Sequence, residues 1–318
     1  MSTTGTNTFT VTRDDIIKAA LRILQVIGVG ETPIAEDYTN CSQALNIMIK
    51  GWSNNQKPLW VLQNIPLAGV TGVSTYGMGP TAGAIGYVAV TNGGTGASNT
   101  GTWTSTGGTT GTTASGTFVA SGGKITSITV TNGGTLYTTT SGFTITFSTG
   151  SGCTYTPYIA GITMSRPLEI ESGFIRDSNG FDTILQPISR QEYDDQGAKQ
   201  SPGIPNQFYY DRQEPNGYIY LLNVPVDVTH TIYLRCQRQF YDMTAGTDNF
   251  DFPEEFFQAL KWGLAAEIYL EYPVSEKIIT IIESKAAKYI EDAFDSSVES
   301  TDITFTIDQR MGASHSGY

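Results

Sequence analysis

A block with almost no charge divides this chain. Between Thr81 and Gly161 the one charged residue is Lys124, although the protein of 318 residues has a formal net charge of −12. The block is rich in Gly, Thr and Ser, and it contains the hexapeptide Val-Thr-Asn-Gly-Gly-Thr twice, at residues 90–95 and 130–135. Asn-Gly pairs are strong signals for β-hairpin turns. The block therefore predicts an inserted all-β domain that contains a duplicated β unit.

The sequence on either side of the block has helical periodicity. Thr12 followed by Asp15 resembles a capping box, and apolar residues then recur at spacings of three and four. A second pair of apolar stripes lies near the C-terminus, over residues 251–300. Two helix pairs can bury their stripes by packing on each other. The predicted fold class is therefore α+β: a four-helix bundle formed by N- and C-terminal helix pairs, with a β module that carries the inserted all-β domain.

Five parts follow from this division of the chain. We expect the extended segments Leu59–Ala68 and Val73–Met78 to pair with each other, and Phe208–Leu222 to form a hairpin. The predicted parts are 1–80, the N-terminal helix pair and the first framework strands; 81–161, the inserted Gly/Thr-rich β domain; 162–250, the framework β module; 251–300, the C-terminal helix pair packing on 12–54; and 301–318, an extended C-terminal tail.

Composition excludes several classes of protein. An acidic chain is unsuited to nucleic-acid binding, because affinity for phosphate needs clustered Lys and Arg. Cys41, Cys153 and Cys236 are odd in number and widely spaced, which predicts reduced thiols rather than disulfides or a zinc site. No apolar run reaches about 18 residues, and the polar N-terminus lacks the features of a signal peptide. We expect no membrane span and no secretory leader.

Residue patterns for catalysis, metals or cofactors are weak, and we predict none of the three. His230 and His315 lie far apart without neighbouring ligand spacing. Gly122-Gly123-Lys124 is followed by Ile125, whereas a phosphate loop needs Ser or Thr there to hold magnesium. A hairpin turn is the favoured interpretation of these glycines.

Two acidic patterns leave alternatives open. The segment 177–182 has oxygen-bearing side chains at alternate positions, as calcium loops do, but it lacks the distal Glu, and a turn with Asx side-chain bonding is favoured. Glu169 and Glu171 share one face of an expected strand. They could form a hydrolytic carboxylate pair, although a solvated strand edge is the commoner arrangement.

The C-terminal tail is the strongest candidate for binding a partner. Ile303, Phe305 and Ile307 alternate with polar residues, in a segment too short to fold alone. Such segments add to a sheet edge or fill a groove on another protein. The alternatives are a strand added to the chain's own β module and a disordered end. The predicted portal- or partner-binding residues are Ile303, Phe305, Ile307, Met311 and Tyr318.

The framework resembles the head-to-tail adaptors of short-tailed bacteriophages, also called tail accessory factors or packaged-DNA stabilisation proteins. The resemblance covers roughly residues 9–79 and 162–310. Its stretches are Thr12–Ile17 with Leu24, Gly30–Pro33, Ala44–Ile49 with Trp52, Leu59-Trp60, Arg166–Ile170, Tyr209-Tyr210, Gly217–Leu221, Pro225, Phe252–Phe256 and Leu264–Glu267. The inserted block departs from the pattern, because most members lack it at this length.

The resemblance implies a structural protein and not an enzyme. It implies a ring of twelve copies beneath the portal protein, which extends the DNA channel and offers a platform to tail nozzle or tail fibre proteins. The tail 303–318 would then reach toward the portal. The implied location is the neck or tail of the virion, after assembly in the host cytoplasm. An acidic channel fits this role, because it lets double-stranded DNA pass without binding.

Two other functions remain possible from the residues. The inserted domain could make the chain a glycan-binding or adhesin-like virion protein, with aromatic side chains stacking on sugars, although core packing explains them equally well. The aromatic residues are Tyr87, Trp103, Tyr137, Tyr155 and Tyr158. The second alternative is a cell-wall hydrolase that uses Glu169 and Glu171.

Overall fold

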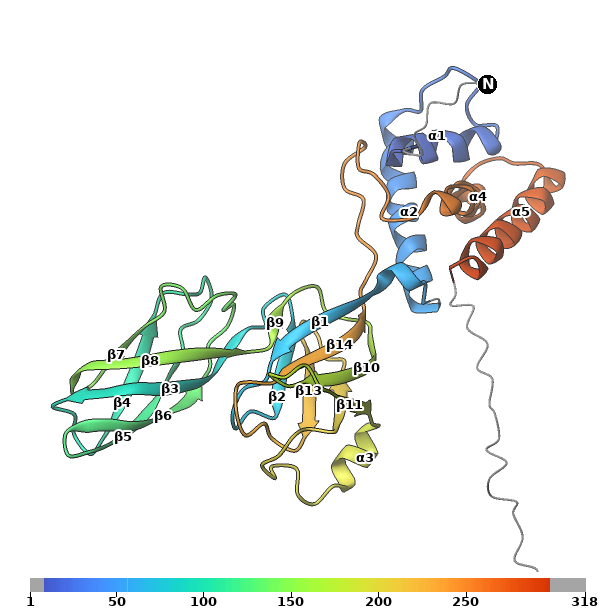
Figure 1. Ribbon diagram of the computed structural model, residues 1–318. Coiled ribbons are helices and arrows are strands. Elements are labelled where there is room, and N and C mark those ends of the chain that lie inside the picture. The colour runs from blue at the N-terminus through green and yellow to red at the C-terminus, as the bar shows by residue number, and fades with distance from the viewer. Residues whose placement is uncertain (1–8, 56, 298–318) are drawn as a thin grey trace, which may run out of the picture.

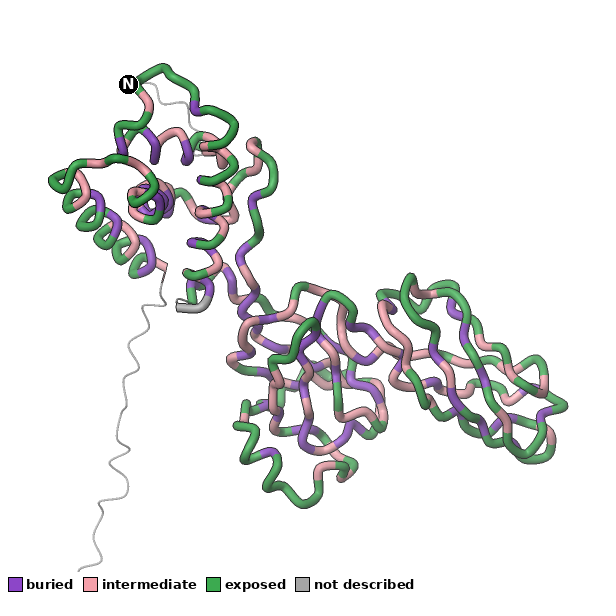
Figure 2. Tube along the Cα trace, turned by 180° about the vertical axis from the view of Figure 1, so that it is seen from behind, coloured by how far each residue is buried: buried purple, intermediate pink, exposed green. Residues whose placement is uncertain are grey.

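The computed structural model describes residues 9–55 and 57–297, and these form three lobes in a row (Figure 1). We call residues 9–61 and 238–297 the helical lobe, residues 62–83 and 161–237 the sheet lobe, and residues 84–160 the distal lobe. The sheet lobe lies in the middle. Buried residues gather inside each lobe (Figure 2), and they form three separate hydrophobic clusters. The molecule is therefore elongated, with all its longer helices at one end.

The helical lobe begins with a well-capped helix. The Thr12 hydroxyl accepts the backbone N–H of Asp15, and the Asp15 carboxylate accepts the backbone N–H of Thr12, so the predicted capping box is confirmed. The helical elements are α1 (Arg13–Ile23), α2 (Ala35–Asn55), η1 (Leu59–Val61), η2 (Glu254–Phe256), α4 (Phe257–Ile268), η3 (Tyr269–Glu271) and α5 (Glu276–Asp295).

Helix α4 lies at the centre of this lobe, with α1, α2 and α5 packed around it (Figure 1). Its side chains Leu260, Leu264 and Ile268 are fully buried. Gly263 lets α2 approach closely, because a Cβ at this position would lie 3.0 Å from the Met48 sulfur. A helix buried on most sides has to be apolar around most of its circumference, and α4 is.

The predicted fold class, a four-helix bundle formed by N- and C-terminal helix pairs, is wrong. Among residues 9–55 and 57–297 the structure is mostly β, with 35% of residues in strands and 27% in helices, and a large, nearly closed sheet dominates it. The physical reason is that apolar stripes identify which face of a helix is buried, but not what covers it. The stripe on α4 is covered from several directions, and the described chain between the helices folds into sheets that hold more residues than the helices do.

The sheet lobe is built on an eight-stranded sheet in the order β1-β14-β10-β11-β12-β13-β2-β9. The expected pairing of the first two framework strands is wrong, because β1 pairs with β14 and β2 with β13 and β9. The expected hairpin is confirmed, since Gln207 lies opposite Leu222 in an antiparallel ladder. The elements are β1 (Leu62–Ala68), β2 (Thr75–Gly79), β9 (Ile162–Thr163), β10 (Glu169–Arg176), β11 (Asp182–Pro187), α3 (Arg190–Asp195), β12 (Gln207–Asp211), β13 (Gly217–Leu222) and β14 (Thr231–Gln237).

The distal lobe is formed entirely by strands of the uncharged block. They make one sheet of β3 and β8 and a second of β6-β5-β4-β7, and a shared core fills the space between them. The strands are β3 (Ala84–Thr95), β4 (Thr100–Thr106), β5 (Ser115–Ser121), β6 (Lys124–Asn132), β7 (Thr144–Phe147) and β8 (Ser151–Ala160).

The repeated hexapeptide makes the same local hydrogen bond in both places, although residues 90–95 all lie in β3 and β6 ends at Asn132. The Asn92 side chain accepts the N–H of Gly94, and the Asn132 side chain accepts the N–H of Gly134. The longer-range contacts are reciprocal. Tyr137 donates its N–H to the Gly83 carbonyl, and Ala97, 40 positions before Tyr137, donates to Gly123, 40 positions after Gly83. This reciprocity supports a duplicated unit whose two copies are intertwined.

Paired strands connect each lobe to the next. At the boundary between the helical and sheet lobes, Leu62 of β1 lies opposite Gln237 of β14, and Arg238 donates its N–H to the Val61 carbonyl. At the other boundary Ala84 of β3 lies opposite Ala160 of β8. The chain therefore enters and leaves each end lobe at one place.

Candidate interaction surfaces

The predicted partner-binding residues Ile303, Phe305, Ile307, Met311 and Tyr318 lie outside the described residues, as does His315. Their role as a docking tail stays a prediction.

The acidic loop 177–182 is a turn held by its own side chains. One oxygen of Asp177 accepts the N–H groups of Asn179 and Phe181. The donation from Phe181 is the main cause that holds the pKa of the Asp177 carboxyl below its usual value. Asp182 makes a two-bond ion pair with Arg176, at 2.7 and 2.8 Å. The carboxylate oxygens are thus engaged by protein donors, as the turn interpretation predicts.

Glu169 and Glu171 each form ion pairs with neighbouring Lys or Arg side chains. Glu169 lies 2.7 Å from the Lys57 ammonium and 3.6 Å from Arg212, and Glu171 lies 3.7 Å from Arg235. Both carboxylates are thus engaged by cations of the chain itself. The arrangement favours structural ion pairs over the hydrolytic pair, although β10 is an interior strand and not the solvated edge that was expected.

The remaining polar patterns also have structural explanations. His230 Nδ1 lies 2.8 Å from the Asp227 carboxylate, with Thr229 bonded to the same carboxylate. Gly122 and Gly123 form the turn between β5 and β6, so the hairpin interpretation is confirmed. Within residues 9–55 and 57–297, no group of three His, Cys, Asp or Glu side chains is placed to hold a metal ion. No helix in the same part of the chain is long and apolar enough to cross a membrane.

The aromatic residues of the inserted block serve mainly in packing. Trp103 and Tyr137 are 1% exposed, and the Trp103 indole donates to the Thr129 carbonyl. Tyr155 packs on the core of the distal lobe, and Tyr87 and Tyr158 pack on the core of the sheet lobe. A sugar-binding platform needs exposed ring faces, so these five residues do not support the glycan-binding alternative.

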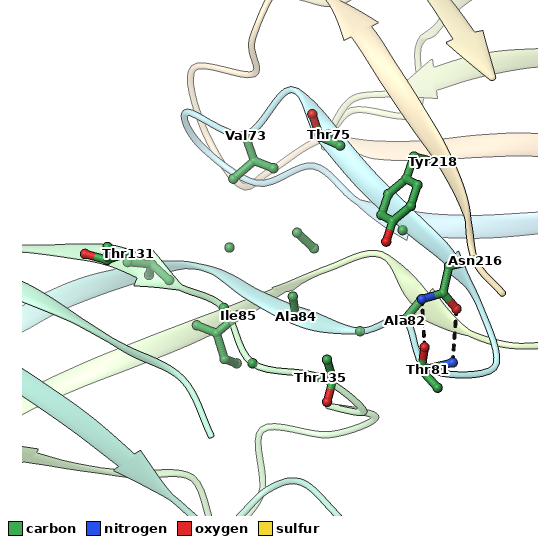
Figure 3. A pocket seen from close by; sticks show the side chains of 17 residues that line it. Val73, Thr75, Thr81, Ala82, Ala84, Ile85, Thr131, Thr135, Asn216 and Tyr218 are labelled. Atoms are coloured by element: carbon green, nitrogen blue, oxygen red, sulfur yellow. Dashed lines mark hydrogen bonds between the residues drawn. The ribbon is translucent and has the colours of Figure 1, made fainter. Parts of the chain in front are cut away.

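A groove of about 320 Å³ lies where the distal lobe meets the sheet lobe (Figure 3). Its residues come from both lobes and carry no charge. On the sheet-lobe side the Asn216 amide bonds twice to Thr81, accepting its N–H at 3.1 Å and donating to its hydroxyl at 2.8 Å. An uncharged groove of this kind has no acid–base pair for catalysis. The groove lies at the junction of the two lobes.

One face of the sheet lobe carries an apolar row that sequence patterns did not reveal; its ends, Pro66 and Ile184, are exposed, while Phe174 and Tyr233 are half-buried with the Arg176 guanidinium over their rings. The register places Pro66, Tyr233, Phe174 and Ile184 side by side on four neighbouring strands. The Phe174 and Tyr233 rings stack at 4.9 Å, and Ile184 is 72% exposed. Each strand contributes one residue, so no local pattern in the sequence could indicate the row. Rows of this kind suit contact with another protein.

Comparison with known proteins adds a family assignment to these surface features. A family model described as SU10 adaptor protein matches residues 120–311, which is more than half of the chain. The chain belongs to this family, consistent with the resemblance to phage head-to-tail adaptors. No curated protein matches the chain.

The matched range differs from the range of the resemblance. It begins in β5 of the distal lobe and runs through residues 162–310, but it does not include 9–79. The second half of the uncharged block therefore belongs to the family pattern. The family implies a structural phage protein that contacts portal or tail components.

Proposed function

We propose that this protein forms a ring of twelve copies beneath the portal protein of a phage virion, where it extends the DNA channel and carries the tail. The observation that carries the proposal is the match to an adaptor family over residues 120–311. Adaptors work by binding proteins on two sides, and they need no catalytic group.

The elongated shape supports this function. Three lobes in a row place the helical lobe and the distal lobe at opposite ends of the molecule (Figure 1). A subunit with two separated ends can contact one partner in the ring wall and another outside it. We assign the helical lobe to the ring wall and the distal lobe to the outer side, toward tail nozzle or tail fibre proteins.

The charge balance supports passage of DNA. A net charge of −12 makes the surface repel phosphate, so DNA in the channel is not retained. We further propose that residues 81–161 fold as a separate domain, and that the tail 301–318 reaches the portal through Ile303, Phe305, Ile307, Met311 and Tyr318.

The test is the mass of the protein alone and after mixing with the portal protein of the same virion, by native mass spectrometry or sedimentation velocity. We expect a monomer in isolation and a complex with twelve copies on each portal ring. A mixture in which the two proteins remain separate at high concentration would contradict the proposal. If the complex forms, electron microscopy should show whether the ring of this protein extends the DNA channel of the portal.

A further inference from the structure

A groove on the helical lobe is acidic and partly apolar. It lies between α2 and the end of α4, with a volume of about 540 Å³. Ile47, on the α2 side, is 59% exposed, and Leu270, beside the groove residue Glu271, is 82% exposed. Neither Glu267 nor Glu271 has an ion-pair partner among the described residues. The lining residues are Asn40, Gln43, Ala44, Ile47, Glu267 and Glu271.

The outer face of α5 has the opposite character. Lys277, Ile281, Lys285 and Lys288 all lie within about a quarter of the helix circumference, at roughly 100° per residue, and all are exposed. No described carboxylate lies within 4.0 Å of these lysines, although Lys285 sits over the Tyr289 ring at 5.5 Å. We call this set the lysine face. Its basic part ends before Asp292, which lies on the same side of the helix.

The two surfaces match in charge and in apolar content. In a chain of net charge −12, two copies repel each other unless local charges are complementary. The lysine face offers three cations around Ile281, and the groove offers two carboxylates near Ile47 and Leu270. Among the described residues, neither surface has the counter-charge that the other supplies.

The placement of these surfaces rules out their pairing within one copy. Helices α2 and α5 lie on different sides of α4 (Figure 1). A contact between two different surfaces of identical subunits is head-to-tail, and repeating it gives a ring where the rotation closes. The occupant that fits the groove is therefore a second copy of this chain.

We propose that α5 of one copy seats in the α2/α4 groove of the next, with its lysines toward Glu267 and Glu271 and Ile281 toward Ile47. The inference deepens the proposed ring by naming the surfaces that neighbours share. It concerns contact between two copies, and it can be tested without the portal.

The test uses cysteine cross-linking. Cys153→Ser removes the more accessible native thiol, while Cys41 and Cys236 are 1% exposed, and burial raises their pKa values to about 11 and about 12. In this background Ile47→Cys and Ile281→Cys are introduced together, and the protein is oxidised mildly at high concentration and low salt. We expect a ladder of covalent dimers, trimers and larger species.

Single variants provide the matched controls. An equal mixture of the Ile47→Cys chain and the Ile281→Cys chain should stop at the dimer, because each copy then has one reactive surface. Either single variant alone should remain monomeric. Efficient dimers from one single variant, or the absence of a ladder from the double variant, would overturn the inference.

Charge reversal adds a second measurement. Glu267→Lys with Glu271→Lys should remove the ladder, and adding Lys277→Glu and Lys285→Glu to the same chain should restore it. All four positions are exposed or at the surface of the lobe, so circular dichroism should show unchanged helix content. A ladder that persists after reversal of the groove charges would also overturn the inference.

The outcomes distinguish this inference from the proposed function. A ladder without association on the portal leaves the contact between copies standing and removes the ring beneath the portal. Assembly on the portal without a ladder, when the cross-linking is repeated in that complex, leaves the ring standing and assigns the contact to other surfaces.

Discussion

Replacing Leu264 by alanine tests whether α4 is the centre of the helical lobe. Leu264 is fully buried, and a Leu→Ala change at such a site costs about 2–5 kcal/mol, depending on how far the cavity collapses. At Gly263, α2 already lies close, with the Met48 sulfur 3.0 Å from where a Cβ would stand, so α2 cannot move in to fill the void. We therefore expect a loss in the upper half of that range, about 4 kcal/mol.

Leu270 supplies the matched control. It is the same residue type six positions later, in η3, and it is 82% exposed. Leu270→Ala should change the free energy of unfolding by less than about 0.5 kcal/mol. With an m-value of about 2 kcal/mol/M, Leu264→Ala should lower the urea midpoint of the helical lobe by about 2 M, while the control stays near the parent.

Tryptophan fluorescence can report on this lobe selectively. The chain has four tryptophans, of which Trp52, Trp60 and Trp262 pack in the helical lobe and Trp103 in the distal lobe. In a Trp103→Phe background the signal comes from the helical lobe alone. Hydrogen exchange of distal-lobe peptides should not change with Leu264→Ala. Equal losses for the two leucine variants, or a loss below about 1 kcal/mol at Leu264, would refute the central position of α4.

Three further predictions concern other parts of the chain. Deletion of residues 301–318 should leave circular dichroism and the unfolding midpoint unchanged but abolish binding to portal protein in a pull-down; retained binding would contradict the docking role. Asn216→Ala should remove both side-chain bonds to Thr81 and cost about 0.5–1.5 kcal/mol, measured as faster hydrogen exchange around residue 81. The bond from Thr12 lowers the pKa of Asp15 below the usual 3.8, so its stabilisation of α1 is complete above that pH and is lost as pH falls through the lower folded value. Asp15→Asn should flatten this acid dependence in hydrogen exchange of α1, and an unchanged profile would show that the cap is not its source.

Local signals in the sequence predicted several individual helices and hairpins, but they did not predict how the strands pair in the sheets. The capping box at Thr12 and the hairpin of β12 and β13 depend on residues close in the chain, and both are confirmed. Strand β8 was not foreseen, because Gly152 and Pro157 interrupt its pattern. Pairings such as β1 with β14 join residues far apart in the sequence, where periodicity carries no information.

The candidate surfaces show the same limit. The aromatic residues of the inserted block gave no means to distinguish core from binding surface until burial was known. The acidic groove joins α2 to the end of α4, and the apolar row joins four strands, so each exists only after folding. What the sequence alone supported was the absence of recognisable catalytic patterns and an ordered set of family-like stretches.

The paired strands between lobes have a mechanical consequence. Each end lobe is connected to the sheet lobe by two antiparallel chain segments that lie side by side. Leu62 is paired with Gln237 at the helical lobe, and Ala84 is paired with Ala160 at the distal lobe. Tension along the long axis is thus shared by two covalent chains and places little load on the hydrogen bonds that cross between them. Twisting is resisted as well, since a double ribbon cannot swivel about a single bond. A subunit built in this way transmits both pulling force and torque from one end lobe to the other.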